Sequence, residues 1–337
     1  MRIGLLLSMG MLVASGVQAE SLGAIPEESG FSGPEESGFS GGVLAGVSVG
    51  ETKSNFATGS AGSERIDALG AAAQQRHLDP VINGDLRYTF ASTGSQLFLG
   101  NLIQDAIRGD GTQQFGLRQQ LGDKGIVAGS LVFNATPVKV WRDPFAVGVA
   151  RQESDVRSHG ARLAWDNIWG SAFSGSVTSR DVKVDGESSG EQYGRAVMGM
   201  LDRNGRVNSA ELSYQFRLAD DQFLEPALRY EKAGLAGSAE SYVSKGLQLT
   251  YAKTSPRWSF VSNLYLGKRD YDEANPLFGQ RADSRDMAID ATLFWHKMFG
   301  ITPLSALLSA SYTTANSGID FYDIRATSIT TGLLYRF

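Results

Sequence analysis

The sequence contains no cysteine, only three histidines, and no long apolar run beyond its first residues. Without cysteine, neither a disulfide framework nor thiolate chemistry is available. The net charge of -5 at pH 7 argues against the basic surface that nucleic-acid binding requires. Glycine is abundant instead, with 40 residues, and aromatic residues make up 10% of the chain. This composition favours strands and turns over helices.

The first residues have the features of a secretory signal peptide. Arg2 precedes an apolar stretch at 4–13, which is shorter than the roughly 20 residues of a membrane-spanning helix. Small residues at Val17 and Ala19 predict cleavage after Ala19. We therefore expect a signal peptide at 1–19, a periplasmic leader at 20–38 and an exported domain at 39–337. The phrase PEESGFSG is repeated in tandem at 26–41, so the repeat begins in the leader and its second copy leads into the domain.

Apolar and polar residues alternate along many segments with a period of two. In NSAELSYQFRL (208–218), alanine, leucine, tyrosine and phenylalanine alternate with serine, glutamate, glutamine and arginine. Residues 82–90 and 287–296 show the same alternation. Strands of about 9–11 residues with this pattern are typical of transmembrane barrels, because one face meets lipid and the other meets water.

The lengths of the connections between these segments alternate as well. Short links are expected near 92–95, 122–125, 167–171, 219–222, 254–257 and 299–303, and the longest links at 51–79, 136–157, 185–205 and 270–284. Short periplasmic turns and long extracellular loops are typical of outer-membrane barrels, which have an even number of strands. The sequence therefore predicts an all-β, antiparallel transmembrane barrel of about fourteen strands, with about twelve as the alternative because two segments near 96–121 are weak.

The chain ends in ITTGLLYRF, with Leu333, Tyr335 and Phe337 on one face. This ending resembles the C-terminal signal by which the barrel-assembly machinery recognises outer-membrane barrels. The resemblance implies an outer-membrane location and that machinery as a partner.

Longer phrases resemble a family of uncharacterised outer-membrane barrel proteins that is known only as a domain of unknown function. The phrases are AIPEESGFSG at 24–33, TPVKVWRDPFAVGVAR at 136–151, RLAWDNIWGSAF at 162–173 and RDYDEANPLFGQRADSRD at 269–286. The resemblance implies a fold and a location but no activity. NPLFG at 275–279 is also similar to a phrase in the C-terminal barrel of surface lipoprotein assembly modulators. Those proteins carry helical repeats before the barrel, which this sequence lacks, so export is only an alternative.

Charged residues on the polar face of the alternating segments are expected to line the lumen. They are Asp85, Arg87, Arg118, Arg162, Glu211, Arg217, Glu225, Arg229, Glu231 and Asp290. A regular hairpin would place Glu211 opposite Arg229, where an ion pair is expected. Because the charges have both signs, strong ion selectivity is not implied.

The segment 136–157 contains apolar residues that would be costly on an exposed loop. We expect it to fold inward as a constriction formed by Trp141, Arg142, Asp143, Phe145 and Arg151. The first hypothesis is therefore a passive channel for small polar solutes. The alternatives are an export or assembly barrel that handles a polypeptide or lipoprotein, and a structural barrel without conductance.

The sequence predicts no enzyme, cofactor or metal site. His77, placed in the first long loop beside Asp79, is tied to no nucleophile, and His159 and His296 lie near opposite ends of strands. Acidic groups at 181–187 and 270–273 lack the glycine-turned order of a calcium loop. Outer-membrane lipid, lipopolysaccharide and small polar solutes are the expected partners, and nucleic acid is not.

Overall fold

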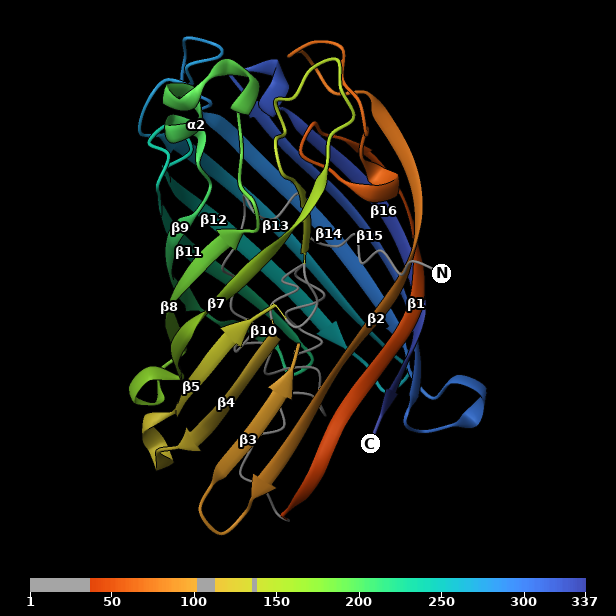
Figure 1. The fold of residues 1–337 in the computed structure, drawn as a ribbon. Coiled ribbons are helices and arrows are strands. Elements are labelled where there is room, and N and C mark those ends of the chain that lie inside the picture. The colour runs from red at the N-terminus through yellow and green to blue at the C-terminus, as the bar shows by residue number, and fades with distance from the viewer. Residues whose placement is uncertain (1–36, 102–112, 135–137) are drawn as a thin grey trace.

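The computed structural model describes residues 37–101, 113–134 and 138–337, which form one closed antiparallel β-barrel (Figure 1). The first strand pairs with the second on one side and with the last on the other, from Gly42 opposite Arg336 to Lys53 opposite Arg325. Closure removes the open sheet edges that would otherwise leave backbone groups unpaired in lipid.

The strands follow one another around the wall in chain order. Their bounds are β1 (Gly38–Lys53), β2 (Gln74–Phe90), β3 (Ser95–Gly100), β4 (Gln113–Gln120), β5 (Ile126–Phe133), β6 (Val138–Trp141), β7 (Glu153–Asp166), β8 (Phe173–Val184), β9 (Gly205–Tyr214), β10 (Phe216–Ala219), β11 (Gln222–Leu235), β12 (Tyr242–Thr254), β13 (Trp258–Tyr271), β14 (Ser284–Trp295), β15 (Leu304–Ser317) and β16 (Ile324–Arg336).

These segments form fourteen wall strands, because two of the wall strands are interrupted. β5 and β6 pair with successive parts of β7, and β9 and β10 pair with successive parts of β11. The prediction of a fourteen-stranded barrel is confirmed, and the alternative of twelve is wrong.

Helices are short in the described part of the chain. They are α2 (Arg195–Leu201) and the 3-10 turns η1 (Gly59–Ala61), η2 (Gly122–Lys124), η3 (Ile168–Gly170), η4 (Glu191–Tyr193), η5 (Met298–Gly300) and η6 (Asp320–Tyr322). None of the helices in those ranges has the length and apolar character needed to cross a membrane.

The outer face of the wall carries a belt of exposed leucines. Leu212, Leu228, Leu247 and Leu266 are register neighbours on four adjacent wall strands and are 47%, 62%, 49% and 48% exposed. Their sequence neighbours Glu211 and Arg229 are buried or nearly so and point to the other face, as the period of two requires. The belt matches the lipid-facing surface of a membrane barrel.

Outward-facing aromatic side chains gather near the short turns. Tyr88 packs edge-on against Phe39 and Phe90, and Tyr214 packs edge-on against Phe173 and in a tilted arrangement against Phe216, at centroid distances of 4.6–4.7 Å. Such rings are favoured at the boundary between lipid and water.

Two short turns share one backbone conformation. In each, the first residue, an aromatic residue and the following glycine have positive φ: 50°, 54° and 71° at Asn167, Trp169 and Gly170, and 55°, 55° and 77° at Lys297, Phe299 and Gly300. The aromatic side chains are 67% and 81% exposed. Both turns therefore display a ring at the end of the barrel where the aromatic residues gather.

The strands are longer at the loop end than the sequence indicated. β2 begins at Gln74, inside the expected loop 51–79, and β6 and β7 reduce the expected loop 136–157 to residues 142–152. Polar residues hid these extensions. QQRH at 74–77 pairs with β1 although it lacks apolar alternation, because a strand that has left the bilayer needs no lipid-facing side chains.

Candidate functional site at the outer end of the barrel

Long connections fold over the end of the barrel opposite the short turns (Figure 1). They span 54–73, 142–152, 185–204, 272–283 and 318–323. Their apolar side chains meet in a cluster, the apolar plug, which consists of Phe56, Phe145, Leu201, Phe278, Phe321 and Tyr322. Phe145 and Phe321 are 0% exposed and stack with ring centroids 5.2 Å apart. Loops distant in sequence therefore pack on one another at the outer end of the barrel.

The loop 142–152 is held inward by buried polar groups. The Asp143 carboxylate accepts hydrogen bonds from the backbone N–H groups of Phe145 and Gly190, each at 2.9 Å. The Arg151 guanidinium donates to the carbonyls of Asn55 at 2.7 Å and Pro144 at 3.1 Å. Burial lowers the pKa of Arg151 to about 10, an effect that Asp143 partly offsets. The loop 142–152 is thus bonded to the connection 185–204 through Asp143 and to the connection 54–73 through Arg151.

Trp141 anchors the same region to the first long loop. Its indole N–H donates to the Ala57 carbonyl at 2.7 Å, and the Arg151 guanidinium lies 4.4 Å from the centre of its ring. Arg142 instead points toward the rim, where its side chain is 44% exposed and 3.9 Å from Glu191. Four of the five expected constriction residues are therefore buried, Phe145 as part of the plug, and the fifth, Arg142, is exposed.

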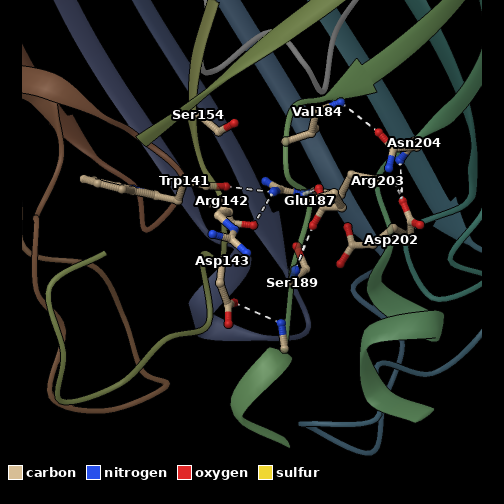
Figure 2. A network of polar contacts seen from close by, with 12 residues as sticks. Trp141, Arg142, Asp143, Ser154, Val184, Glu187, Ser189, Asp202, Arg203 and Asn204 are labelled. Carbon is tan, nitrogen blue, oxygen red and sulfur yellow. Dashed lines mark hydrogen bonds and ion pairs between the residues drawn. The ribbon is translucent and has the colours of Figure 1, made fainter. Parts of the chain in front are cut away.

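Arg203 links the connection that contains α2 to this loop (Figure 2). Its Nε lies 2.8 Å from Glu187, and its terminal nitrogen donates to the carbonyls of Trp141 at 2.7 Å and Arg142 at 3.2 Å. Asn204 accepts a hydrogen bond from the backbone N–H of Val184 at 2.8 Å. This network joins the connection 185–204 to the end of β6 and to the start of the loop 142–152.

Tyr322 connects three loops at the centre of the plug. Its hydroxyl donates to the Glu240 carboxylate and accepts a hydrogen bond from the Asn275 amide at 2.8 Å. Burial raises the pKa of Glu240 to about 7, although the Tyr322 hydrogen bond opposes the shift. Burial and the neighbouring Glu240 charge raise the pKa of Tyr322 well above its ordinary value.

A cavity of about 110 Å³ lies between the plug and the outer ends of the wall strands. Its apolar lining includes Val140, Val182, Val184, Val207, Ala233 and Leu235, and its aromatic lining Phe56, Tyr242, Tyr271 and Tyr322. Arg180, Arg203, Arg269 and Glu240 also line it. This arrangement suits a small molecule that has both an apolar body and a charged group.

Several of the charged residues expected in the lumen occur in pairs. Asp85 and Arg87 are 2.7 Å apart, and Glu211 and Arg229 are 3.3 Å apart in directly opposite positions, as the hairpin register predicted. Asp290 accepts a hydrogen bond from Asn263 at 2.8 Å.

The other charged residues of that set differ in their burial and surroundings. Arg162, Glu225 and Glu231 are buried, and the Arg118 guanidinium lies 4.7 Å from the centre of the Phe98 ring. Arg217 is exposed beside a short turn. Whether the whole set lines a conducting path stays a prediction.

The expected position of His77 is wrong. It lies on β2, opposite Gly50, and not in the first long loop. Its ring nitrogens lie 2.6 Å from Asp79 and 3.1 Å from the Thr52 hydroxyl. These contacts join β1 to β2 above the apolar belt. Across the parts of the chain that the structure describes, no group of three or more histidine, cysteine or acidic residues is arranged to hold a metal ion.

Sequence reasoning missed Arg180, Glu240 and Tyr322. The signal for Arg180 was a change within β8 in which face of the strand carries the apolar side chains. Val177 faces outward and is 54% exposed, whereas Val182 and Val184 face inward and are buried. The reversal marks where the wall leaves the bilayer. Glu240 and Tyr322 lie on separate loops, and no local pattern indicated their contact.

The closed wall, the apolar belt and the inward charges define an outer-membrane-type β-barrel. Residues 38–336 match the family described as "Protein of unknown function (DUF2860)", and the chain belongs to this family. The first copy of the repeated PEESGFSG phrase (26–33) lies outside the matched and described residues, whereas the second copy (34–41) ends inside them, at the start of β1. No curated protein matches the sequence significantly.

Solved structures similar to the chain include three outer-membrane proteins. The channel DcaP of Acinetobacter baumannii has a TM-score of 0.45 at 8% identity, with 89% of this chain and 98% of that chain covered. OmpT of Vibrio cholerae has a TM-score of 0.38 at 7% identity, with 88% and 98% covered. OprD of Pseudomonas aeruginosa has a TM-score of 0.39 at 11% identity, with 96% and 99% covered. At these identities and scores, no function is transferred from them.

Proposed function

We propose that the protein is a porin-like channel of the outer membrane for small polar solutes, with its outer mouth closed by the apolar plug in the conformation described. The burial of Phe145 carries the proposal. The loop 142–152 places this ring against Phe321, from the loop before the last strand. A barrel closed by loops, rather than filled along its length by apolar side chains, has a mouth that loop movement can open.

The size and lining of the wall support a solute path. Barrels of about eight strands are filled by side chains, whereas those of about 16–18 strands leave an aqueous channel. The fourteen wall strands here stand nearer the larger class. Charges of both signs on the inner face, such as Glu211 and Arg229, suit polar solutes without strong selection for one ion.

The outward face supports an outer-membrane location. The leucine belt, the aromatic rings near the short turns and the charged outer ends of the strands form successive bands. Within the proposal, the signal peptide is removed after Ala19, and the barrel-assembly machinery reads Leu333, Tyr335 and Phe337, which are 43%, 47% and 54% exposed. Lipopolysaccharide then surrounds the outer rim. The proposal includes no enzymatic step.

Single-channel conductance in planar bilayers tests the proposal. The sharpest variant removes residues 144–149 and keeps Val138–Trp141, because that segment is part of the wall. We expect larger or longer-lived conducting steps than in the unaltered protein. The control replaces Phe299, whose ring is 81% exposed at the opposite end, with alanine. If neither the unaltered barrel nor the deletion variant conducts although both are folded, the result would contradict the channel and favour a structural barrel.

A further inference from the structure

We propose that the cavity beside the plug binds a small organic carboxylate with an apolar or aromatic body, and that Arg180 pairs with its carboxylate. The inference rests on the proposed function, because such a molecule would be a solute of the channel. It names a site and a solute class that the barrel architecture alone does not indicate.

The walls of the cavity fit an apolar body. Val182, Val184 and Val207 come from two neighbouring strands, and all three are buried. The aromatic side forms a continuous row, in which Tyr271 lies 5.5 Å from Tyr242 and 6.0 Å from Tyr322 between ring centroids. A dry apolar cavity of about 150 Å³ holds a benzene molecule. The volume of about 110 Å³ therefore sets the body at roughly one six-membered ring or smaller.

The arginines of the cavity differ in their partners. Arg203 lies 2.8 Å from Glu187, and Arg269 lies 2.9 Å from Asp286 while stacking on Tyr242. The side chain of Arg180 makes no hydrogen bond or ion pair with any residue that the structure describes. Its electrostatic neighbour is Glu231, whose carboxylate already accepts a hydrogen bond from the Tyr242 hydroxyl at 2.7 Å. One guanidinium in the cavity wall is thus left without a bonded carboxylate.

An anion is the ligand that complements this lining. Arg203 and Arg269 are already paired with carboxylates, and Glu240 is bonded by Tyr322. The guanidinium of Arg180 is therefore the cationic group of the lining that a ligand can pair with, and it would repel a cation. The planar fork of arginine matches a carboxylate through two parallel hydrogen bonds. The remaining surface is apolar or aromatic, which excludes a strongly hydrated polyanion as the best fit. A monocarboxylate with a ring-sized body satisfies both requirements.

Calorimetric titration of the full-length protein in detergent micelles tests the site, with benzoate as the probe. Benzamide and benzylamine have nearly the same shape but are neutral and cationic. Arg180→Gln removes the proposed partner. Arg157→Gln is the matched control, because Arg157 is on the neighbouring strand with a side chain that is 72% exposed. Ala233→Leu fills the cavity without a change of charge, since Ala233 lines it and is 1% exposed. Heat-modifiable migration shows that each variant is folded.

We expect benzoate to bind the unaltered protein and Arg157→Gln alike, and Arg180→Gln at least about tenfold more weakly, as loss of a charged hydrogen-bond pair implies. Ala233→Leu should also weaken binding, and both analogues should bind more weakly than benzoate. Absence of benzoate binding, equal binding by Arg180→Gln, or preference for benzylamine would overturn the inference. The two proposals fail separately: a barrel that binds benzoate but is silent in bilayers contradicts only the channel, and a conducting barrel without benzoate binding contradicts only this site.

Discussion

Glu240 should make the closure of the outer mouth depend on pH. Its carboxyl is buried at 7% exposure and is bonded by Tyr322, whose loop contributes two rings to the plug. Burial raises its pKa from 4.5 to about 7. If the loops are released into water, the pKa returns to its ordinary value. The plugged state therefore holds a proton that the released state gives up between these two values.

Because the pKa of Glu240 is raised in the plugged state, its stabilising contribution is complete below pH 4.5 and is lost as the pH rises to about 7. A pKa difference of one unit corresponds to about 1.4 kcal/mol. The difference between the two pKa values of Glu240 therefore changes the free energy of loop release by about 3 kcal/mol between low and high pH. Release of the loops should thus be least frequent near pH 5 and most frequent above pH 7. Glu240→Gln, which carries no charge at either pH, should remove this dependence.

Hydrogen exchange of residues 272–283 and 318–323 measures the release, after correction for the intrinsic pH dependence of amide exchange. Glu191→Gln is the control, because Glu191 lies on another loop with a side chain that is 60% exposed. The control should keep the pH dependence of the unaltered protein. The reasoning is refuted if Glu240→Gln retains the same dependence, or if protection of the plug increases from pH 5 to pH 8.

Two further predictions concern the plug and the belt. Phe145→Ala should destabilise the plug by about 3–5 kcal/mol, because it leaves a cavity among packed rings. Bilayer recordings should show more frequent opening of this variant, whereas Phe299→Ala should open as often as the unaltered protein. Equal opening frequencies of the two variants would contradict the role of Phe145. Leu228→Arg, in the middle of the leucine belt, should destabilise the barrel by about 2–4 kcal/mol, whereas Leu218→Arg beside a short turn should cost about 0–1 kcal/mol. Denaturant unfolding in lipid vesicles compares the two, and similar losses would argue against the assigned position of the bilayer.

The sequence by itself determined the wall of this protein. Where strands cross lipid, each residue faces either hydrocarbon or the interior, so the pattern around Leu212 and Glu211 contains the fold and even the ion pair between Glu211 and Arg229. The alternation of short and long links was sufficient for the number of strands. The sequence pattern did not locate the strand ends that extend beyond the bilayer, as at Gln74, because side chains there no longer need to face lipid.

Only the tertiary structure decided how the long loops pack at the outer end of the barrel. An inward course of the segment 136–157 was expected from its apolar residues, but the partners of residues 142–152 come from loops far apart in the chain. Phe145 meets Phe321, and Tyr322 meets Glu240, across separations that no local period describes. Arg180 became notable in the same way, because the lack of a bonded partner depends on every neighbouring side chain. Strand faces follow from short-range alternation, whereas loop packing depends on contacts that exist only after the barrel has closed.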